Sequence, residues 1–224
     1  MDWTYNTIWT DQLPPSELWI ADLSVSPSAK GSLGGGSYLF VRGFKSVLNS
    51  LEDFPVKGSV KYLQLTMANI TSLKGLSSLG KVKRLELDYC LKLQSDGGIS
   101  EVADSLEWLN ITQAKKFPLG QEVMGLSQLK VLCLNNCAPL QDLEFLNCFP
   151  NLLDFRFVET KVISGDLSPL LRHPKLCSVG FLDKRHYNMR SSEVEEKLRE
   201  RRNSSITIAH NGPYETFKYK ALSA

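Results

Sequence analysis

The sequence predicts an α/β solenoid, in which successive strands build one parallel sheet and a short helical or irregular segment follows each strand. A short run of alternating apolar residues recurs along the middle of the chain. The segments on either side lack this repetition, and a solenoid needs such ends to cover its terminal units. The chain has 224 residues and 42% hydrophobic content, so it can bury a sizeable core.

The stretch from residue 129 to 149 carries the clearest copy of the repeated unit. Leu129, Leu132 and Leu134 alternate as in a strand, and Leu143 and Leu146 follow at a helix-like spacing. One copy alone cannot bury this apolar ridge. Stacked copies can, because each covers the apolar edge of its neighbour.

Six copies of this pattern follow one another at intervals of 22, 24, 23, 23 and 24 residues. Each opens with the triplet L-x-x-L-x-L or a close variant. A small residue, Thr or Cys follows at the ninth position in the first five copies. The copies begin at Val60, Val82, Leu106, Leu129, Leu152 and Leu176, and the ninth residues are Ala68, Cys90, Ala114, Cys137 and Thr160.

This pattern resembles the short-repeat type of the leucine-rich repeat family over roughly residues 60–184. The resemblance implies a right-handed horseshoe with a parallel β-sheet on its concave face, short helical or irregular convex segments, and a cap at each end. Asn is the usual ninth residue of that family, and this sequence lacks it. Cys and Thr can still bond to backbone, whereas Ala68 and Ala114 cannot.

The chain is therefore divided into an N-terminal cap over 1–57, six repeats over 58–184 and a C-terminal cap over 185–224. In the N-terminal cap, Glu17–Val25 and Ser37–Phe44 are β-rich and predict a wide hairpin or two strands joined by a loop. Lys45–Phe54 predicts a short amphipathic helix. No Gly-Lys-Ser/Thr follows the glycine-rich segment 31–37, which favours a linker over a phosphate loop.

In the C-terminal cap, Ser191–Arg202 predicts a short helix that begins with a Ser cap and has Glu early and Arg late. Glutamates alternate with its basic residues, so a solvated helix face is favoured over a nucleic-acid patch. The tail returns to β-type sequence at 205–209 and 216–219, around Asn211-Gly212-Pro213. Whether the glycine-rich segment 31–37 or this helix also binds a partner stays open.

Charge and cysteine content narrow the class of protein. A net charge of +2 argues against a protein that coats nucleic acid. The N-terminus does not read as a signal peptide, and no apolar run is long enough to span a bilayer. The five cysteines are odd in number and two occupy ninth positions, which favours reduced thiols. We expect a cytoplasmic protein that binds neither nucleic acid nor membrane.

Residue patterns for catalysis are scarce. The three histidines, His173, His186 and His210, form no zinc-ligand spacing, and neither a nucleophile elbow nor a dinucleotide fingerprint is present. His173 is expected in a loop, and His186 with Tyr187 in a capping contact. The sequence therefore predicts no enzyme, no catalytic residue, no metal and no cofactor.

The candidate binding site is the concave face, which the strand alternation assigns to the third, fifth and seventh residues of each copy. Aromatic and Arg side chains dominate protein-binding hot spots, and they recur in these columns. An alternative is that Arg84 stacks on Trp108 and pairs with Glu86, which needs no partner. The candidate protein-binding residues are Tyr62, Gln64, Arg84, Glu86, Asp88, Tyr89, Trp108, Asn110, Asp154 and Arg156.

The sequence thus predicts a non-catalytic scaffold, monomeric when free, that binds a protein through its concave β-face. It is similar to small bacterial leucine-rich repeat proteins, some of which are thought to be immunity proteins, and this likeness implies occlusion of a toxin domain. A regulatory adaptor of a cytosolic complex is a second hypothesis. A hydrolase that uses Asp88, Asp154 and Glu159 is the third, although Asp88 lies two or more repeats from the other two carboxylates.

Overall fold

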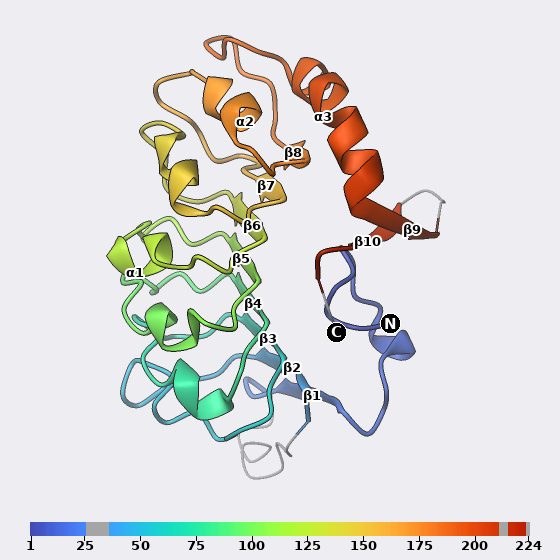
Figure 1. Cartoon of the computed structure of the whole chain (residues 1–224). Helices are drawn as coiled ribbons and strands as arrows, with labels where there is room; N and C mark the ends of the chain where they lie inside the picture. The colour runs from blue at the N-terminus through green and yellow to red at the C-terminus, as the bar shows by residue number, and fades with distance from the viewer. Residues whose placement is uncertain (26–35, 211–214, 223–224) are drawn as a thin grey trace.

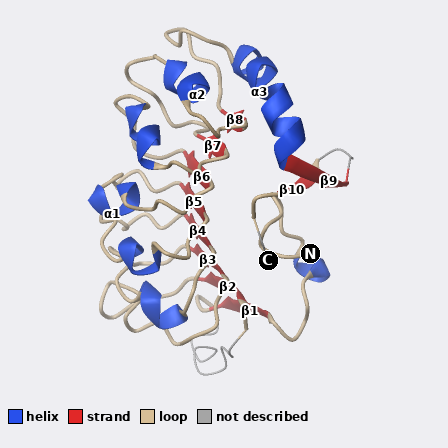
Figure 2. Ribbon diagram, in the orientation of Figure 1, coloured by secondary structure: helices blue, strands red, loops and turns tan. Residues whose placement is uncertain are grey.

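The computed structural model describes residues 1–25, 36–210 and 215–222, and its main feature is one eight-stranded parallel sheet. The strands are neighbours in chain order, which gives an open, solenoid-like α/β arrangement (Figure 1). Short helices and loops lie on one side of the sheet, and both chain ends lie on the other (Figure 2). The strands are β1 (Leu18–Asp22), β2 (Tyr38–Arg42), β3 (Tyr62–Thr66), β4 (Arg84–Asp88), β5 (Trp108–Thr112), β6 (Val131–Asn135), β7 (Asp154–Arg156) and β8 (Ser178–Gly180).

Strand positions agree with the prediction for the periodic region. Strands β3 to β6 each cover the third to seventh residues of one copy, and β7 and β8 cover the third to fifth. Equivalent residues pair across neighbouring strands, as in Leu63 with Leu85 and Leu85 with Leu109. A shift of one residue would turn these leucines to the opposite face, so burial fixes the register. The predicted parallel sheet is confirmed.

The first hydrophobic core fills the space between the sheet and the connecting segments, and the leucine triplets lie in it. Among the described residues, no helix combines the length and apolar composition that a bilayer crossing requires. The connecting helices are short: η3 (Leu76–Leu79), η4 (Ile99–Val102), α1 (Gln121–Met124), η5 (Glu144–Cys148) and α2 (Ser168–Arg172).

The ninth-position side chains bond to backbone where their chemistry allows, as expected. Each of three such groups contacts the carbonyl oxygen of a residue on the preceding strand whose side chain faces the first core. These contacts connect one copy to the next. The contacts are Cys90 Sγ to Leu65 O at 3.6 Å, Cys137 Sγ to Ile111 O at 3.3 Å and Thr160 Oγ1 to Leu134 O at 2.5 Å.

Of the two alternatives predicted for the N-terminal segment, the hairpin is wrong, and two strands joined by a longer connection agree with the structure. Strand β1 pairs parallel with β2, and β2 pairs parallel with β3, so the sheet continues to residue 18. The connection between β1 and β2 is long enough for a parallel crossover, and most of the glycine-rich segment 31–37 lies outside the described residues.

The helix predicted over Lys45–Phe54 is also absent, and this described segment consists of bends and turns. The Ser46 hydroxyl donates to Asp53 Oδ1 at 2.6 Å and accepts the Ser50 N–H at 3.0 Å. Such local side-chain bonds compete with helical hydrogen bonds. Leu51 and Phe54 still reach the first core from this irregular path.

The C-terminal cap contains the expected helix, α3 (Ser191–Ser205), which packs across the β8 end of the sheet (Figure 1). The predicted Ser cap is wrong, because Arg190 occupies the N-cap position and Ser191 is the first helical residue. Asp183 accepts the Ser191 N–H at 2.7 Å, and Glu193 accepts the Arg190 N–H at 2.8 Å. After α3, β9 (Ile206–His210) and β10 (Thr216–Tyr219) form an antiparallel pair. The Asn211-Gly212-Pro213 turn lies outside the described residues.

The capping role expected for His186 and Tyr187 is confirmed. His186 Nε2 lies 2.9 Å from the carbonyl oxygen of Val162, and the Tyr187 hydroxyl accepts the Val162 N–H at 3.1 Å. The two side chains together provide hydrogen-bond partners for the N–H and the carbonyl of Val162.

His173 is buried in the loop after α2, as expected for a structural residue. Its Nδ1 accepts N–H groups from Lys175 and Leu176 at 3.3 and 3.0 Å, and Nε2 lies 3.0 Å from the Phe149 carbonyl. This geometry requires a neutral ring with the proton on Nε2. Burial is the main cause that lowers the pKa of His173 below its usual value.

Replacement of His173 by Asn is expected to flatten the pH dependence of stability near neutral pH. In the unfolded wild-type chain, His173 binds a proton below pH about 6.5. In the folded protein its lowered pKa keeps the ring neutral to a lower pH. The stability that this pKa difference contributes is therefore complete above pH about 6.5 and is lost as the pH falls below that value. Urea titrations from pH 7.5 to 5 would measure this, with His210→Asn at an exposed position as the control. Equal pH dependence in the wild type and His173→Asn would contradict the assignment.

Candidate functional site

The sheet face opposite the first core, here called the inner face, carries the third, fifth and seventh residues of each copy. Two segments cover it: the N-terminal arm, residues 1–15, and the C-terminal hairpin, residues 206–210 and 215–222. These segments are joined, because Asn6 N donates to the Phe217 carbonyl and Phe217 N donates to Asn6 Oδ1, both at 2.9 Å. Both lie on the same side of the sheet (Figure 1). The inner face is therefore covered by the chain itself.

A second hydrophobic core lies between the inner face and these two segments. Trp3 from the arm and Tyr219 from the hairpin are both completely buried there. The Trp108 and Tyr219 rings lie 6.3 Å apart. The buried members are Trp3, Leu13, Tyr38, Tyr62, Trp108, Val131, Cys133, Leu153, Cys177, Ile206, Phe217, Tyr219 and Leu222.

The expected exposure of half of the candidate binding residues is wrong. Tyr62, Arg84, Glu86, Trp108 and Asp154 are all buried. The reason is hydrophobic: several residues in the inner columns are apolar or aromatic, and burying them against other apolar side chains is favourable. The half-buried candidates are Gln64, Asp88, Asn110 and Arg156, and Tyr89 alone among the ten is exposed.

Arg84 is the polar centre of this covered face. Its Nε donates to Glu86 Oε1 at 2.7 Å, and its guanidinium carbon lies 3.8 Å from the centroid of the Trp108 ring. The predicted stacking on Trp108 and pairing with Glu86 are therefore confirmed. Arg84 Nη1 also donates to the carbonyls of Trp3 and Tyr5, at 3.0 and 2.6 Å. The side chain thus fixes the N-terminal arm to the sheet.

Asp154 forms a second polar centre, nearer the C-terminal hairpin. Its Oδ2 accepts the Tyr219 hydroxyl at 2.5 Å and Arg156 Nε at 3.0 Å. The negative charge of Asp154 is the main cause that raises the pKa of Arg156. Burial, followed by the Asp154 charge, raises the pKa of Tyr219. Oδ1 of Asp154 is buried without a hydrogen-bond partner among the described residues.

A polar hollow of about 400 Å³ remains on the inner face. Eight of the ten candidate residues line it, and only Asp88 and Tyr89 do not. The buried Oδ1 of Asn135 also has no partner among the described residues. The lining residues that sequence reasoning missed are Asn6, Thr7, Ile8, Phe40, Cys133 and Asn135.

The missed residues are of three kinds, of which Phe40 lies on β2, before the first copy. Cys133 and Asn135 occupy the same columns as the candidates, so the strand alternation already placed them on this face. Asn6 comes from the arm, and only the apolar character of the columns indicated that some segment must cover them. Nothing in the local sequence around Asn6 identifies that segment.

The groups in the hollow suit hydrogen bonding better than bond cleavage. Burial raises the pKa of the Cys133 thiol to about 12, so it is protonated and a weak nucleophile at neutral pH. Asp154 lines the hollow and Asp88 does not, and their strands β7 and β4 are three strand steps of about 4.8 Å apart. No group of three or more metal-binding side chains occurs within the described ranges. The hollow offers amide, carboxylate and guanidinium groups for recognition.

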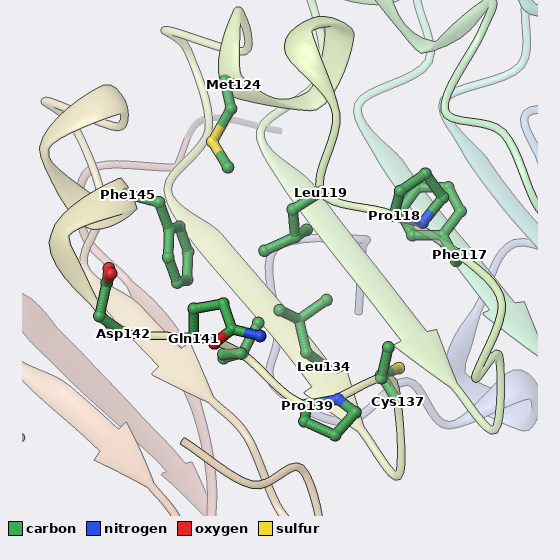
Figure 3. Close-up of a pocket in the computed structure, with 12 residues that line it drawn as sticks. Phe117, Pro118, Leu119, Met124, Leu134, Cys137, Pro139, Gln141, Asp142 and Phe145 are labelled. Carbon is green, nitrogen blue, oxygen red and sulfur yellow. The ribbon is translucent and has the colours of Figure 1, made fainter. Parts of the chain in front are cut away.

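A separate apolar groove of about 320 Å³ opens between the segments that follow β5 and β6. Leu119 and Met124 reach it from the first segment, and Phe145 reaches it from the second, with Leu134 of β6 below them (Figure 3). Asp142 also lines the groove, and its Oδ1 accepts the Glu144 N–H at 2.9 Å. The groove is suited to apolar side chains, whereas the inner-face hollow is polar.

Comparisons of the chain with protein-family models, with curated proteins and with solved structures gave no match. Function is therefore inferred from the residues of this chain and their geometry.

Proposed function

We propose that the chain is a leucine-rich repeat solenoid of the horseshoe type, and that it is a cytoplasmic scaffold that binds a protein without chemistry of its own. The observation that carries this proposal is the polar hollow on the inner face. Two buried acceptors in it, Asp154 Oδ1 and Asn135 Oδ1, have no partner among the described residues. Buried polar groups in native proteins are normally hydrogen-bonded to protein or to ordered water, so these two acceptors mark the hollow as polar, and a partner would bind the accessible groups around them.

The accessible groups around these acceptors favour a protein partner. Gln64, Asn110 and Arg156 are half-buried at the hollow, and amide and guanidinium groups give directional hydrogen bonds to backbone and side chains. A polyanion would be matched by an excess of Lys and Arg, whereas here Arg84 and Arg156 are paired with Glu86 and Asp154. Five free thiols support a reducing compartment.

The hydrolase hypothesis has less support from the same geometry. The Asp154 carboxylate is bonded to Tyr219 and Arg156, and the Asp88 carboxylate accepts Gln64 Nε2 at 2.7 Å. The separation of β4 from β7 leaves these two groups too far apart to act on one bond. Glu159 is exposed beyond β7 and does not line the hollow.

Asn110→Arg is expected to weaken partner binding at least about tenfold, because a long charged side chain would fill the hollow. Wild type, Asn110→Arg and Asn147→Arg would serve as baits in a native lysate, followed by calorimetry with the purified partner. Asn147 is exposed on η5 and gives the same substitution away from the inner face. Equal binding by the two variants would contradict the hollow as the site.

The partner's own activity then separates the two forms of the proposal. A toxin domain that loses activity in the complex would support an immunity protein that acts by occlusion. A partner that stays active would support a regulatory adaptor.

A further inference from the structure

We infer that the edge of the sheet where strands β2 to β6 end is a docking surface for an acidic protein segment with apolar side chains. This inference rests on the proposed protein-binding function but uses a different surface from the hollow. It combines an exposed apolar patch, a run of lysines and the apolar groove.

The apolar patch, here called the strand-end patch, consists of Val47, Leu48, Met67, Tyr89 and Leu91. These side chains are between 47% and 84% exposed, and they account for five of the eleven large exposed apolar side chains in the described part of the chain. Single exposed apolar residues are ordinary, but a contiguous group on one surface marks an interaction site.

Backbone hydrogen bonds place the loops of the strand-end patch side by side. Met67 N donates to the Asp88 carbonyl at 2.8 Å, next to Tyr89, and Leu91 N donates to the Tyr89 carbonyl at 2.9 Å. On the other side, Ser46 N donates to Asn69 Oδ1 at 2.8 Å, which brings Val47 beside the Met67 loop. The patch is therefore one surface and not a set of scattered residues.

Two residues of the strand-end patch occupy a backbone conformation that their side chains disfavour. The residue directly after each of β2 to β6 has a positive φ, which suits Gly or Asn. These residues are Gly43, Met67, Tyr89, Gln113 and Asn136, with φ of 69°, 58°, 55°, 62° and 50°. Bulky apolar residues at two of these positions, with their side chains in solvent, indicate a use other than folding.

Lysines set the charge of the same edge. The four loop segments 43–48, 67–72, 89–95 and 113–118 contain Lys45, Lys92, Lys115 and Lys116 and no Asp or Glu. The Asp53 carboxylate accepts the Val47 N–H at 2.8 Å and Asp142 lines the groove, so the four lysines outnumber the two nearby carboxylates and leave an excess of positive charge at this edge. Lys92, Lys115 and Lys116 are exposed. Complementary charge favours an acidic partner and speeds its association.

The apolar groove continues this edge, because Lys115 and Lys116 directly precede the groove residues Phe117 and Leu119. An acidic segment that pairs with the lysines can therefore place one apolar side chain in the groove and another on the strand-end patch. Polar side chains between the apolar ones, including Thr66, Asn69 and Gln113, are half-buried and can hydrogen-bond to a protein. Lipid tails would leave such groups without partners, so a protein is favoured over a membrane.

Selection of random linear peptides on phage against the full-length chain tests this inference. The expected peptides are rich in Asp and Glu and contain Leu, Phe or Met. Tyr89→Ala/Leu91→Ala is expected to lower their affinity at least about tenfold. Lys115→Glu/Lys116→Glu should slow association, and added salt should weaken binding. Both double variants change exposed side chains, so the fold is retained.

The matched control is Ile163→Ala/Leu182→Ala, which removes two exposed apolar side chains that follow β7 and β8. It should bind the selected peptides like the wild type. Peptides without acidic enrichment, peptides that bind all variants equally, or no patch-dependent peptide would overturn the inference. Binding to vesicles of phosphatidylcholine and phosphatidylserine that is lost in the patch variant would overturn it in favour of a membrane surface. If a native partner is lost by Asn110→Arg but kept by Tyr89→Ala/Leu91→Ala, the proposed function stands and this inference fails.

Discussion

Arg84→Ala is expected to lower the free energy of unfolding by about 3–5 kcal/mol, the range for a broken buried ion pair. The substitution leaves the Glu86 carboxylate buried without its partner and removes the donor that the Trp3 and Tyr5 carbonyls share. It also removes the cation that stacks on the Trp108 ring. Urea unfolding followed by far-ultraviolet circular dichroism would measure the loss.

A double variant separates the charge from the packing in this site. Arg84→Met/Glu86→Leu removes both charges and keeps similar volume, so most of the lost stability should return, as for other buried pairs replaced by apolar residues. A loss below about 1 kcal/mol in Arg84→Ala would mean that water reaches Glu86 and that the pair behaves as an exposed one.

Trp3→Ala is expected to cost about 3–5 kcal/mol, as for other large aromatic residues removed from a core. Trp3 is completely buried, although it is only the third residue of the sequence. Its removal leaves a cavity in the second core, which also contains Tyr62 and Trp108. Circular dichroism in urea suits this measurement, because fluorescence would change with the loss of the indole itself.

Trp9→Ala is the matched control for the arm, because Trp9 is 40% exposed. It should change stability much less than Trp3→Ala does. If the two variants were equally stable, the arm would be a loosely attached segment, and the inner face would be open to partners as the sequence first suggested.

The sequence was sufficient to predict the sheet because its signal is local and repeated. Leu63, Leu85 and Leu109 each sit at the same place in a copy, and burial of one face fixes every strand in register. The contacts of Arg84 could be predicted for the same reason, since Trp108 lies opposite it on the adjacent strand and Glu86 lies two residues further along its own strand.

The cover on the inner face could not be predicted, because it depends on contacts between distant segments. The sequence around Asn6 and around Phe217 contains no pattern that predicts their pairing. Strand alternation predicts which side chains lie on a face of the sheet but not which segment covers that face. The one available signal was the apolar character of Tyr62, Trp108 and Val131, which cannot remain in water at low cost. Hydrophobic columns on a supposedly open face therefore indicate a missing cover.

The bond between Asn6 and Phe217 spans 211 residues, which has a consequence for how the molecule reaches its folded state. Contacts of such large sequence separation form late, because a long loop must close before they contribute. During synthesis the hairpin follows the arm and the sheet out of the ribosome, so Trp3 and Trp108 stay without this cover until the hairpin has emerged. A chain made only as far as the sheet therefore exposes this apolar face to aggregation, and closure of the arm onto the hairpin is a late folding step.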